Sequence, residues 1–325
     1  MRIAVVGAGA VGGFIGAMLS KAGEDVTLIA RGAHGRAMSE RGIRIKGSLG
    51  EFVARPKVTN DATTLTDVDL VILTLKAHSL MRVAPTLTSL LGPSTSILSA
   101  QNGIPWWYFY RHGGECDGLQ LEAIDPGGTL RRSLPPERTI GCVIYCSTIV
   151  SEPGVIEHLE GTRFAIGEAD GSRSERCHDI AQTFLRAGLR CPIRSNIRHD
   201  IWVKLLGSVA FNPISALSRA TLLDIVRCPE THDLSLQIMI EAETIAKRLG
   251  IEVAITKEQR LRGAEKVGKH KTSMLQDVEA GRPLEWESII GVLVELGNKL
   301  NLPLPHMTAV AACTKLLSEG LSQTA

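Results

Sequence analysis

The sequence predicts an α/β Rossmann-type N-terminal domain followed by an all-α C-terminal domain. In the first third of the chain, short β-branched runs alternate with helical stretches, a pattern typical of a parallel sheet with helices on its faces. From residue 196 onward the strand pattern stops and long amphipathic helices follow. A glycine-rich motif at the start of the chain supports the same assignment. We therefore expect domains at 1–195 and 196–325.

The expected elements of the first domain follow a regular order. Strands are expected at 2–6, 25–30, 70–74 and 96–99, and helices near 10–22 and 79–91. Further strands are expected at 140–150, 155–159 and 164–167, before a helix at 174–187. Because parallel strands need crossover connections, the early alternation predicts a parallel sheet.

Residues 105–134 interrupt this order with a segment rich in glycine, proline and aromatic residues. Positions 106–110 hold five of the thirteen aromatic residues of the chain. Aromatic side chains carry large apolar surfaces, so such a cluster must cover or contact something. A packed hairpin, a subunit contact and a lid over the active site all remain open.

The second domain is predicted from apolar residues at helical spacing. Residues 236–249 have this spacing and end at Gly250, a residue suited to the left-handed conformation of a helix C-cap. Another helix is expected after Pro283. Its apolar face contains Trp286, Ile289, Ile290, Leu293, Gly297 and Leu300.

Charge and composition exclude several classes of partner. The 36 Lys and Arg residues against 34 Asp and Glu residues give a formal net charge of +2, too small for a nucleic-acid or anionic-membrane surface. The apolar stretch 3–19 is interrupted by glycines and lacks a basic leader beyond Arg2, so we expect neither a signal peptide nor a membrane span. Small molecules are the expected partners, and a homodimer is left open.

The cysteines predict neither disulfides nor a metal site. They are odd in number and scattered, without a CxxC pair or a Cys/His pair at metal-ligand spacing. Reduced thiols of this kind are typical of a cytoplasmic protein. Their positions are 116, 142, 146, 177, 191, 228 and 313.

The strongest local motif is a β-branched run that leads directly into GxGxxG at Gly7, Gly9 and Gly12. In such motifs the first glycine makes a tight turn, the second lets the backbone approach a pyrophosphate, and the third allows close packing of helix on strand. The helix that begins at Ala10 and Val11 would offer unpaired N–H groups and a positive dipole end to the phosphates. These five residues are the predicted dinucleotide site.

The end of the second strand selects the nucleotide. NAD-binding proteins usually have a carboxylate there for the ribose 2′-hydroxyl, whereas this chain has Arg31. A guanidinium can form paired charge-assisted hydrogen bonds with a 2′-phosphate. The sequence therefore favours NADP(H), with a solvated loop charge as the alternative role of Arg31.

Residues 200–212 form a predominantly apolar helix in which Lys204, Ser208 and Asn212 recur every four positions. This spacing places the three polar side chains in one stripe. A lysine in such a helix must reach water, pair with a carboxylate or line a polar cavity, and the pattern leaves these open. Pro213 predicts that the helix kinks or ends next to Asn212.

Taken together, the motifs resemble the ketopantoate reductase (2-dehydropantoate 2-reductase) family over nearly the whole chain. Their order and spacing are specific, although each is modest alone. They are GAGAVGG at 7–13, TLKA at 74–77, QNG at 101–103, WVKL at 202–205, NPISAL at 212–217, and TSMLQD at 272–277 followed by Glu285.

The resemblance implies NADPH-dependent reduction of ketopantoate to pantoate in pantothenate biosynthesis, with a reaction cleft between the two domains. It implies that Lys204 is the general acid or base and that Glu285 assists it or binds substrate. Substrate contacts are implied for Asn212, Ser273 and, at its position in the stripe, Ser208. Lys76 and Asn102 are implied to lie near the cofactor and the reaction centre, with Asn102 also contacting substrate.

Several of these residues have ordinary alternatives. Glu285 in the first turn of a helix is common dipole chemistry, Ser273 is a plain loop serine, and Lys76 is equally a surface charge. The chain also departs from the family, which usually has a substrate-binding Asn where this chain has Ser208, and residues 105–134 are longer than the family minimum. The exact 2-oxo acid therefore stays open. Alternatives are another 2-hydroxy acid or opine-type dehydrogenase, or a non-catalytic NADPH-binding protein.

Overall fold

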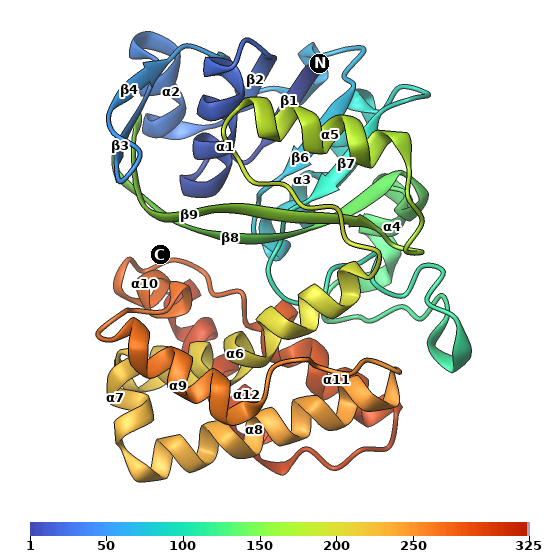
Figure 1. Cartoon of the computed structure of the whole chain (residues 1–325), viewed down its shortest axis with the longest axis vertical. Coiled ribbons are helices and arrows are strands. Elements are labelled where there is room, and N and C mark those ends of the chain that lie inside the picture. The colour runs from blue at the N-terminus through green and yellow to red at the C-terminus, as the bar shows by residue number, and fades with distance from the viewer. Residues whose placement is uncertain (324–325) are drawn as a thin grey trace. The chain divides into compact units, whose positions relative to one another are not determined.

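The computed structural model describes residues 1–323 and divides the chain into two compact units (Figure 1). The sheet unit contains Met1–Gln101, Pro105–Leu119 and Gly127–Ile197. The helical unit contains Asn102–Ile104, Gln120–Pro126 and Arg198–Ala325. Two short segments from the first half of the chain thus belong to the helical unit.

A nine-stranded mixed sheet forms the centre of the sheet unit, in the order β4-β3-β9-β8-β7-β6-β1-β2-β5. The strands β8, β7, β6, β1, β2 and β5 are parallel, whereas β8–β9 and β3–β4 are antiparallel pairs. The predicted parallel arrangement of the early strands is therefore right for β1, β2, β6 and β7, whereas the antiparallel pairs β3–β4 and β8–β9 were not predicted. The strand bounds are β1 Arg2–Val6, β2 Asp25–Ile29, β3 Ile43–Gly47, β4 Phe52–Ala54, β5 Lys57–Thr59, β6 Leu70–Leu73, β7 Ser96–Ser99, β8 Thr139–Glu152 and β9 Val155–Glu168.

The four early strands lie within one residue of their predicted bounds, but β9 differs. Residues 155–159 and 164–167, predicted as two strands, are parts of one fourteen-residue strand paired with β8. Residues 160–163, which separate the two predicted strands, include Gly161, whose φ of +75° is in the left-handed region. The sequence of these residues suggests a break between two strands. Pairing with β8 and the conformational freedom of Gly161 let one strand continue through them.

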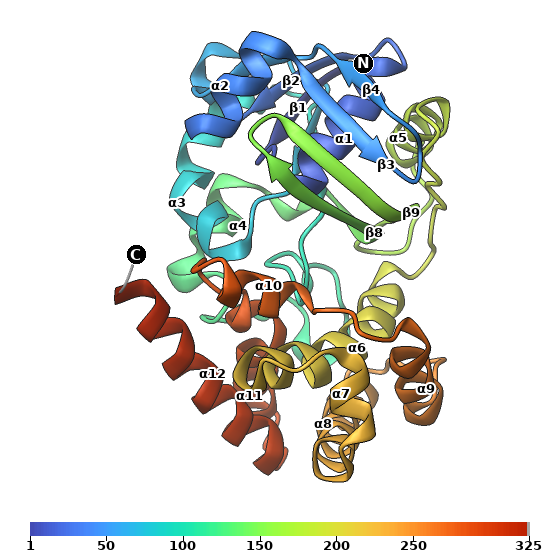
Figure 2. The same cartoon turned by 90° about the vertical axis from the view of Figure 1, so that its left-hand side faces the viewer.

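Helices pack on the strands of both halves of the sheet. The helix α1 packs on β2, β3, β8 and β9, and Figure 2 shows it behind the β8–β9 hairpin. Its side chains Phe14, Ile15 and Leu19 are fully buried in the main apolar core. The helices of this unit are α1 Ala10–Lys21, α2 Gly32–Arg41, α3 Ala77–Leu87, α4 Thr129–Ser133 and α5 Glu175–Arg186, with short 3-10 turns at Ala62–Thr64, Thr88–Leu90, Gly114–Cys116, Pro126–Gly128 and Pro136–Arg138.

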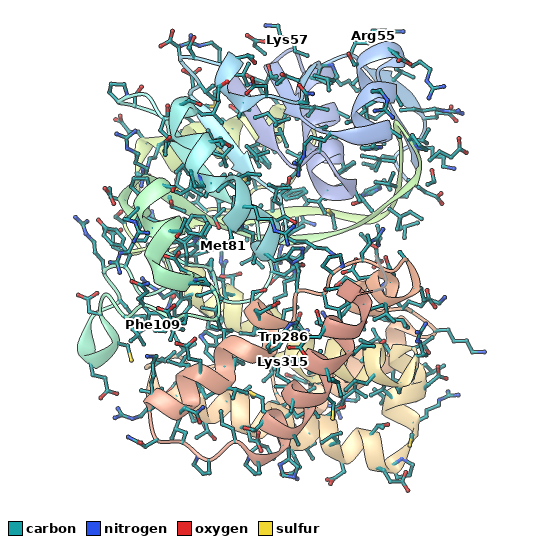
Figure 3. The ribbon with its side chains drawn as sticks, turned by 180° about the vertical axis from the view of Figure 1, so that it is seen from behind. Arg55, Lys57, Met81, Phe109, Trp286 and Lys315 are labelled. Carbon is teal, nitrogen blue, oxygen red and sulfur yellow. The ribbon has the colours of Figure 1, made fainter. Side chains whose placement is uncertain are left out.

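The aromatic segment packs inside the molecule. Residues 106–109 are at most 7% exposed, and the Trp106 indole N–H donates to the Leu134 carbonyl oxygen at 3.1 Å (Figure 3 labels Phe109). The Trp107 ring lies so close to Gly141 that a Cβ there would stand 2.5 Å from it. These rings are therefore packed as predicted, but in a segment of turns and not in a β-hairpin.

The helical unit consists of helices of very different length. They are α6 Ile197–Ser218, α7 Leu222–Arg227, α8 Pro229–Arg248, α9 Lys257–Val267, α10 Ser273–Glu279, α11 Val292–Lys299 and α12 Pro305–Gln323, with a π-helical turn at Glu287–Gly291 that we call the π-turn. The start of α12 is held by Glu241 of α8, whose carboxylate accepts the Met307 amide at 2.8 Å. The predicted face after Pro283 is thus divided between the π-turn and α11.

Of the two outcomes predicted next to Asn212, a kink or an end, the structure contradicts the end. The helix α6 continues through Pro213 to Ser218. Proline removes one helical hydrogen bond, but the side chains of Phe211 and Ile214 on either side are each only 4% exposed, and their packing holds the helix together. By length and apolar composition α6 could cross a membrane, yet 67% of its most apolar window is buried, as in the core helix of a globular protein.

Candidate active site

The glycine-rich turn between β1 and α1 has the sterics that its sequence predicts. Gly7 has a φ of +96°, and its amide donates to the Ile29 carbonyl oxygen at 3.2 Å. A Cβ on Gly12 would collide with the carbonyl oxygen of Gly7, so only glycine lets α1 approach the turn. A Cβ on Gly9, in contrast, would meet no described atom within 4 Å. Gly9 therefore leaves open space beside the backbone, as close approach of a pyrophosphate requires.

Thr74, directly after β6, hydrogen-bonds to the backbone of this turn. Its hydroxyl lies 2.8 Å from the Gly7 carbonyl oxygen and 3.1 Å from that of Val6, and can donate to either. Thr74 is the first residue of the TLKA motif, and no role was predicted for it. A small polar residue at the end of a buried strand next to the glycine motif is the signal that identifies it.

His34 of α2 joins the same region and was not predicted. Its Nδ1 accepts the Gly154 amide at 2.9 Å, so this nitrogen is unprotonated, and its buried Nε2 lies toward the Ala8 carbonyl without a well-formed hydrogen bond. Burial lowers the pKa of His34, and the Ala8 carbonyl opposes this only in part. A neutral imidazole thus stands between the glycine-rich turn and the β8–β9 turn.

Two cationic side chains follow the strands on either side of β1. Arg31, exposed, is the N-cap residue of α2 just after β2, and Lys76 is the N-cap residue of α3 just after β6. Because β6, β1 and β2 are neighbouring parallel strands, both residues lie at the same sheet edge as the glycine-rich turn. The carboxyl ends of β6, β1 and β2 therefore have helix N-termini and cationic side chains together, a combination suited to binding phosphate groups.

In the helical unit, the structure brings together two predicted residues that are 102 positions apart. The Lys204 ammonium donates to Oδ1 of Asn102 at 2.7 Å. Lys204 lies on α6 and is half-buried, and its neighbours Ile201, Leu205 and Leu206 are buried. The amine is thus held in a fixed position by an amide in largely apolar surroundings, where it can donate a proton and stabilise negative charge.

The other predicted substrate residues belong to three segments of the same unit. Ser208 and Asn212 are half-buried on α6, and the Ser208 hydroxyl donates back to the Lys204 carbonyl oxygen at 3.3 Å. Ser273 is exposed at the first position of α10. Glu285 lies just before the helical residues Trp286 and the π-turn, not in a first helical turn as predicted (Figure 3 labels Trp286).

Clusters of metal-ligating side chains are absent from the part of the chain that the structure describes. No group of three His, Cys, Asp or Glu side chains within residues 1–323 could hold a metal ion. All seven cysteines are free thiols. Burial raises the pKa of Cys191 to about 12 and that of Cys177 to about 11.

A dinucleotide turn in a mixed sheet and a hydrogen-bonded lysine in a helical unit define a nicotinamide-dependent oxidoreductase of two units. Residues 3–171 match the family described as "Ketopantoate reductase PanE/ApbA", and residues 196–318 match "Ketopantoate reductase PanE/ApbA C terminal". The chain belongs to the ketopantoate reductase family, whose members reduce ketopantoate to pantoate with NADPH.

Individual relatives match the chain over almost its full length. A 2-dehydropantoate 2-reductase from Mesorhizobium japonicum is 44% identical over 98% of both chains. One from Pyrococcus horikoshii is 30% identical over 94% of this chain and 93% of its own. A solved structure from Ralstonia solanacearum, described as a candidate ketopantoate reductase, is 36% identical with a TM-score of 0.93, covering 99% of this chain and 98% of that one. The predicted resemblance and two-part fold are therefore confirmed.

Proposed function

We propose that this chain is an NADPH-dependent reductase that converts 2-dehydropantoate to pantoate. The observation that carries the proposal is the half-buried Lys204 ammonium, held at 2.7 Å by Asn102, in a chain of this family. Reduction of a ketone needs a hydride at the carbonyl carbon and a proton at the carbonyl oxygen. When bound, NADPH supplies the hydride. The Lys204 Nζ donates a proton to the developing alkoxide and is left as the neutral amine.

The sheet unit fits the cofactor. Open space beside Gly9 and the steric need for glycine at positions 7 and 12 support pyrophosphate binding at Gly7, Gly9, Ala10, Val11 and Gly12. The exposed Arg31 guanidinium would pair with the 2′-phosphate. Lys76 and Asn102 would lie near the cofactor and the reacting carbonyl.

The helical unit would hold the substrate. Glu285 would accept a hydrogen bond from a substrate hydroxyl or pair with Lys204, and Asn212 and Ser273 would contact the substrate's polar groups. Ser208 occupies the place of the family's usual Asn, with its hydroxyl turned to its own helix. A substrate group normally bound by that Asn would need water as a bridge.

We propose that residues 1–195 act as the NADP-binding domain and residues 196–325 as the substrate and catalytic domain. The expected partner is a small 2-oxo acid, with no nucleic acid or membrane. Seven free thiols within the described residues support a cytoplasmic enzyme of pantothenate biosynthesis. The mass measured in solution distinguishes a monomer from a homodimer.

The decisive experiment is NADPH oxidation by the purified full-length chain with ketopantoate. We expect ketopantoate to give the largest kcat/KM among a panel of 2-oxo acids, with and without added amines. A larger kcat/KM for another 2-oxo acid would identify a different 2-hydroxy acid dehydrogenase. Turnover that requires an amine would identify an opine-type enzyme. NADPH binding without oxidation of the cofactor by any 2-oxo acid would identify a non-catalytic protein.

A further inference from the structure

The segment Asn102–Ile104 follows strand β7 of the sheet but belongs by its contacts to the helical unit. Asn102 accepts from Lys204 there. One hydrogen bond contributes little net stability, because it replaces hydrogen bonds to water. If this bond alone held the segment, Asn102 could move away from the Lys204 amine. Something else must hold this segment in place.

The π-turn provides that second attachment. The Ser288 carbonyl oxygen accepts the Ile104 amide at 2.9 Å. In a regular α-helix an interior carbonyl is used by the amide four residues further on. Single π-turns inside helices are rare and are frequent at functional sites. Here the turn presents a backbone acceptor to the segment that carries Asn102.

Gly103 makes this approach possible. Its φ is +79°, and a Cβ on it would lie 2.5 Å from the Ser288 carbonyl carbon and collide with the carbonyl oxygen. Both the backbone conformation and the close contact therefore require glycine. Because the obstacle is backbone and not the end of a flexible side chain, a larger residue must displace the loop.

We propose that Gly103 and the π-turn are positioning elements that fix Asn102 against Lys204 and so place the proton donor. The proposal rests on the proposed function. Its physical content is that the Ser288 carbonyl and the Lys204 ammonium hold the two ends of a three-residue segment, so displacing one end releases the other. A misplacement of about 1 Å at a catalytic group can lower turnover about 100-fold.

The test compares Gly103→Ala with Gly113→Ala. Gly113 has nearly the same φ, +77°, but a Cβ on it would meet no described atom within 4 Å, so it controls for backbone strain alone. We expect Gly103→Ala to lower kcat by roughly 10- to 100-fold, with the Kd for NADPH changed no more than in Asn102→Ala. Gly113→Ala should stay within about 2-fold of wild type, because strain without a clash acts on stability.

A double-mutant cycle separates positioning from general damage. If Gly103 acts through Asn102, then Gly103→Ala should have little further effect on kcat in an Asn102→Ala background. If the double variant instead lost kcat by the product of the two single-variant losses, the proposal would be overturned. Should Gly103→Ala fail to fold, Ile104→Pro replaces it, because it removes the amide that donates to the Ser288 carbonyl and adds no Cβ at position 103.

A readout independent of turnover distinguishes this proposal from the proposed function. The rate at which an amine-reactive reagent labels Lys204, measured by peptide mass spectrometry, should rise equally in Gly103→Ala and Asn102→Ala. It should not change in Gly113→Ala. If wild type fails to reduce ketopantoate but this labelling pattern holds, only the proposed substrate is wrong. If wild type turns over and labelling in Gly103→Ala equals that of wild type, the positioning role is wrong.

Discussion

The glycine-rich turn of the sheet unit and the Lys204 site of the helical unit are built in opposite ways. The turn takes its key residues from positions 7 to 12, and the local geometry requires glycine at Gly7 and Gly12. The Lys204 site combines α6 with the Asn102 segment, 102 positions away, and with the π-turn that holds that segment. A contiguous site is fixed by local geometry, whereas a dispersed site depends on how remote segments pack.

The cationic side chains of the two regions also differ, in their exposure and in their hydrogen bonding. Arg31 is exposed at a helix N-terminus, while Lys204 is half-buried and hydrogen-bonded to Asn102. An exposed cation contributes to binding an anion, whereas an oriented and partly desolvated amine can also take part in the chemical step. The two regions should therefore fail differently when their cations are removed.

The largest effect is expected at Lys204. Lys204→Ala should lower kcat by roughly 100- to 10,000-fold, the usual range for a lost general acid, with NADPH binding close to normal. Lys204→Arg should not restore turnover, because guanidinium keeps its charge but does not release its proton. Steady-state kinetics and NADPH titration by fluorescence check both points. Near-normal turnover of Lys204→Ala would remove this residue from the mechanism.

Arg31→Ala should show the opposite behaviour. It should weaken NADPH binding by about 1.5–3 kcal/mol, or roughly 10- to 150-fold in Kd, with NADH little affected. Arg41→Ala, exposed in the last turn of the same helix, is the matched control and should change neither Kd. Equal losses for the two cofactors with Arg31→Ala would contradict the assignment to the 2′-phosphate.

Ser208→Asn tests whether the helical site is arranged for ketopantoate. The Ser208 hydroxyl bonds to its own helix, so an amide at this position would add donor and acceptor groups that serine does not offer. We expect kcat/KM for ketopantoate to improve by roughly 1–3 kcal/mol, about 5- to 150-fold.

The same variant should be assayed with the best competing 2-oxo acid. Loss of activity from the added bulk would indicate a pocket shaped for a different substrate. No change with either substrate would show that Ser208 does not contact the substrate.

The smallest effect concerns His34 and the stability of the sheet unit. Burial lowers its pKa below the ordinary 6.5, so between the two values the unfolded chain binds the proton that the folded chain does not. His34 thus supports stability fully above pH 6.5, and part of this is lost as pH falls below 6.5. His34→Gln should therefore reduce the fall in Tm on acidification. His178→Gln, on an exposed face of α5, is the control and should keep the wild-type slope. An unchanged slope in His34→Gln would show that the ring does not titrate as proposed.

Much of the fold was predictable because secondary structure follows local rules. The bounds of β1 and β7 match their prediction, since each is a short buried run that turn residues bound on at least one side. The strands β3, β4 and β5 were not predicted, because β4 and β5 have only three residues each and β3 has two charged residues among its five. Their pairing with distant strands, not their own propensity, makes them strands.

The sequence by itself determined the glycine-rich turn, because a positive φ at Gly7 and the tight approach at Gly12 are demands of adjacent backbone. Only the tertiary structure decided that α6 passes through Pro213, where buried apolar side chains outweigh one lost hydrogen bond. Only the tertiary structure also placed Asn102 on Lys204. That contact closes a loop of about a hundred residues, and no local pattern encodes such a closure, since packing across many elements sets it.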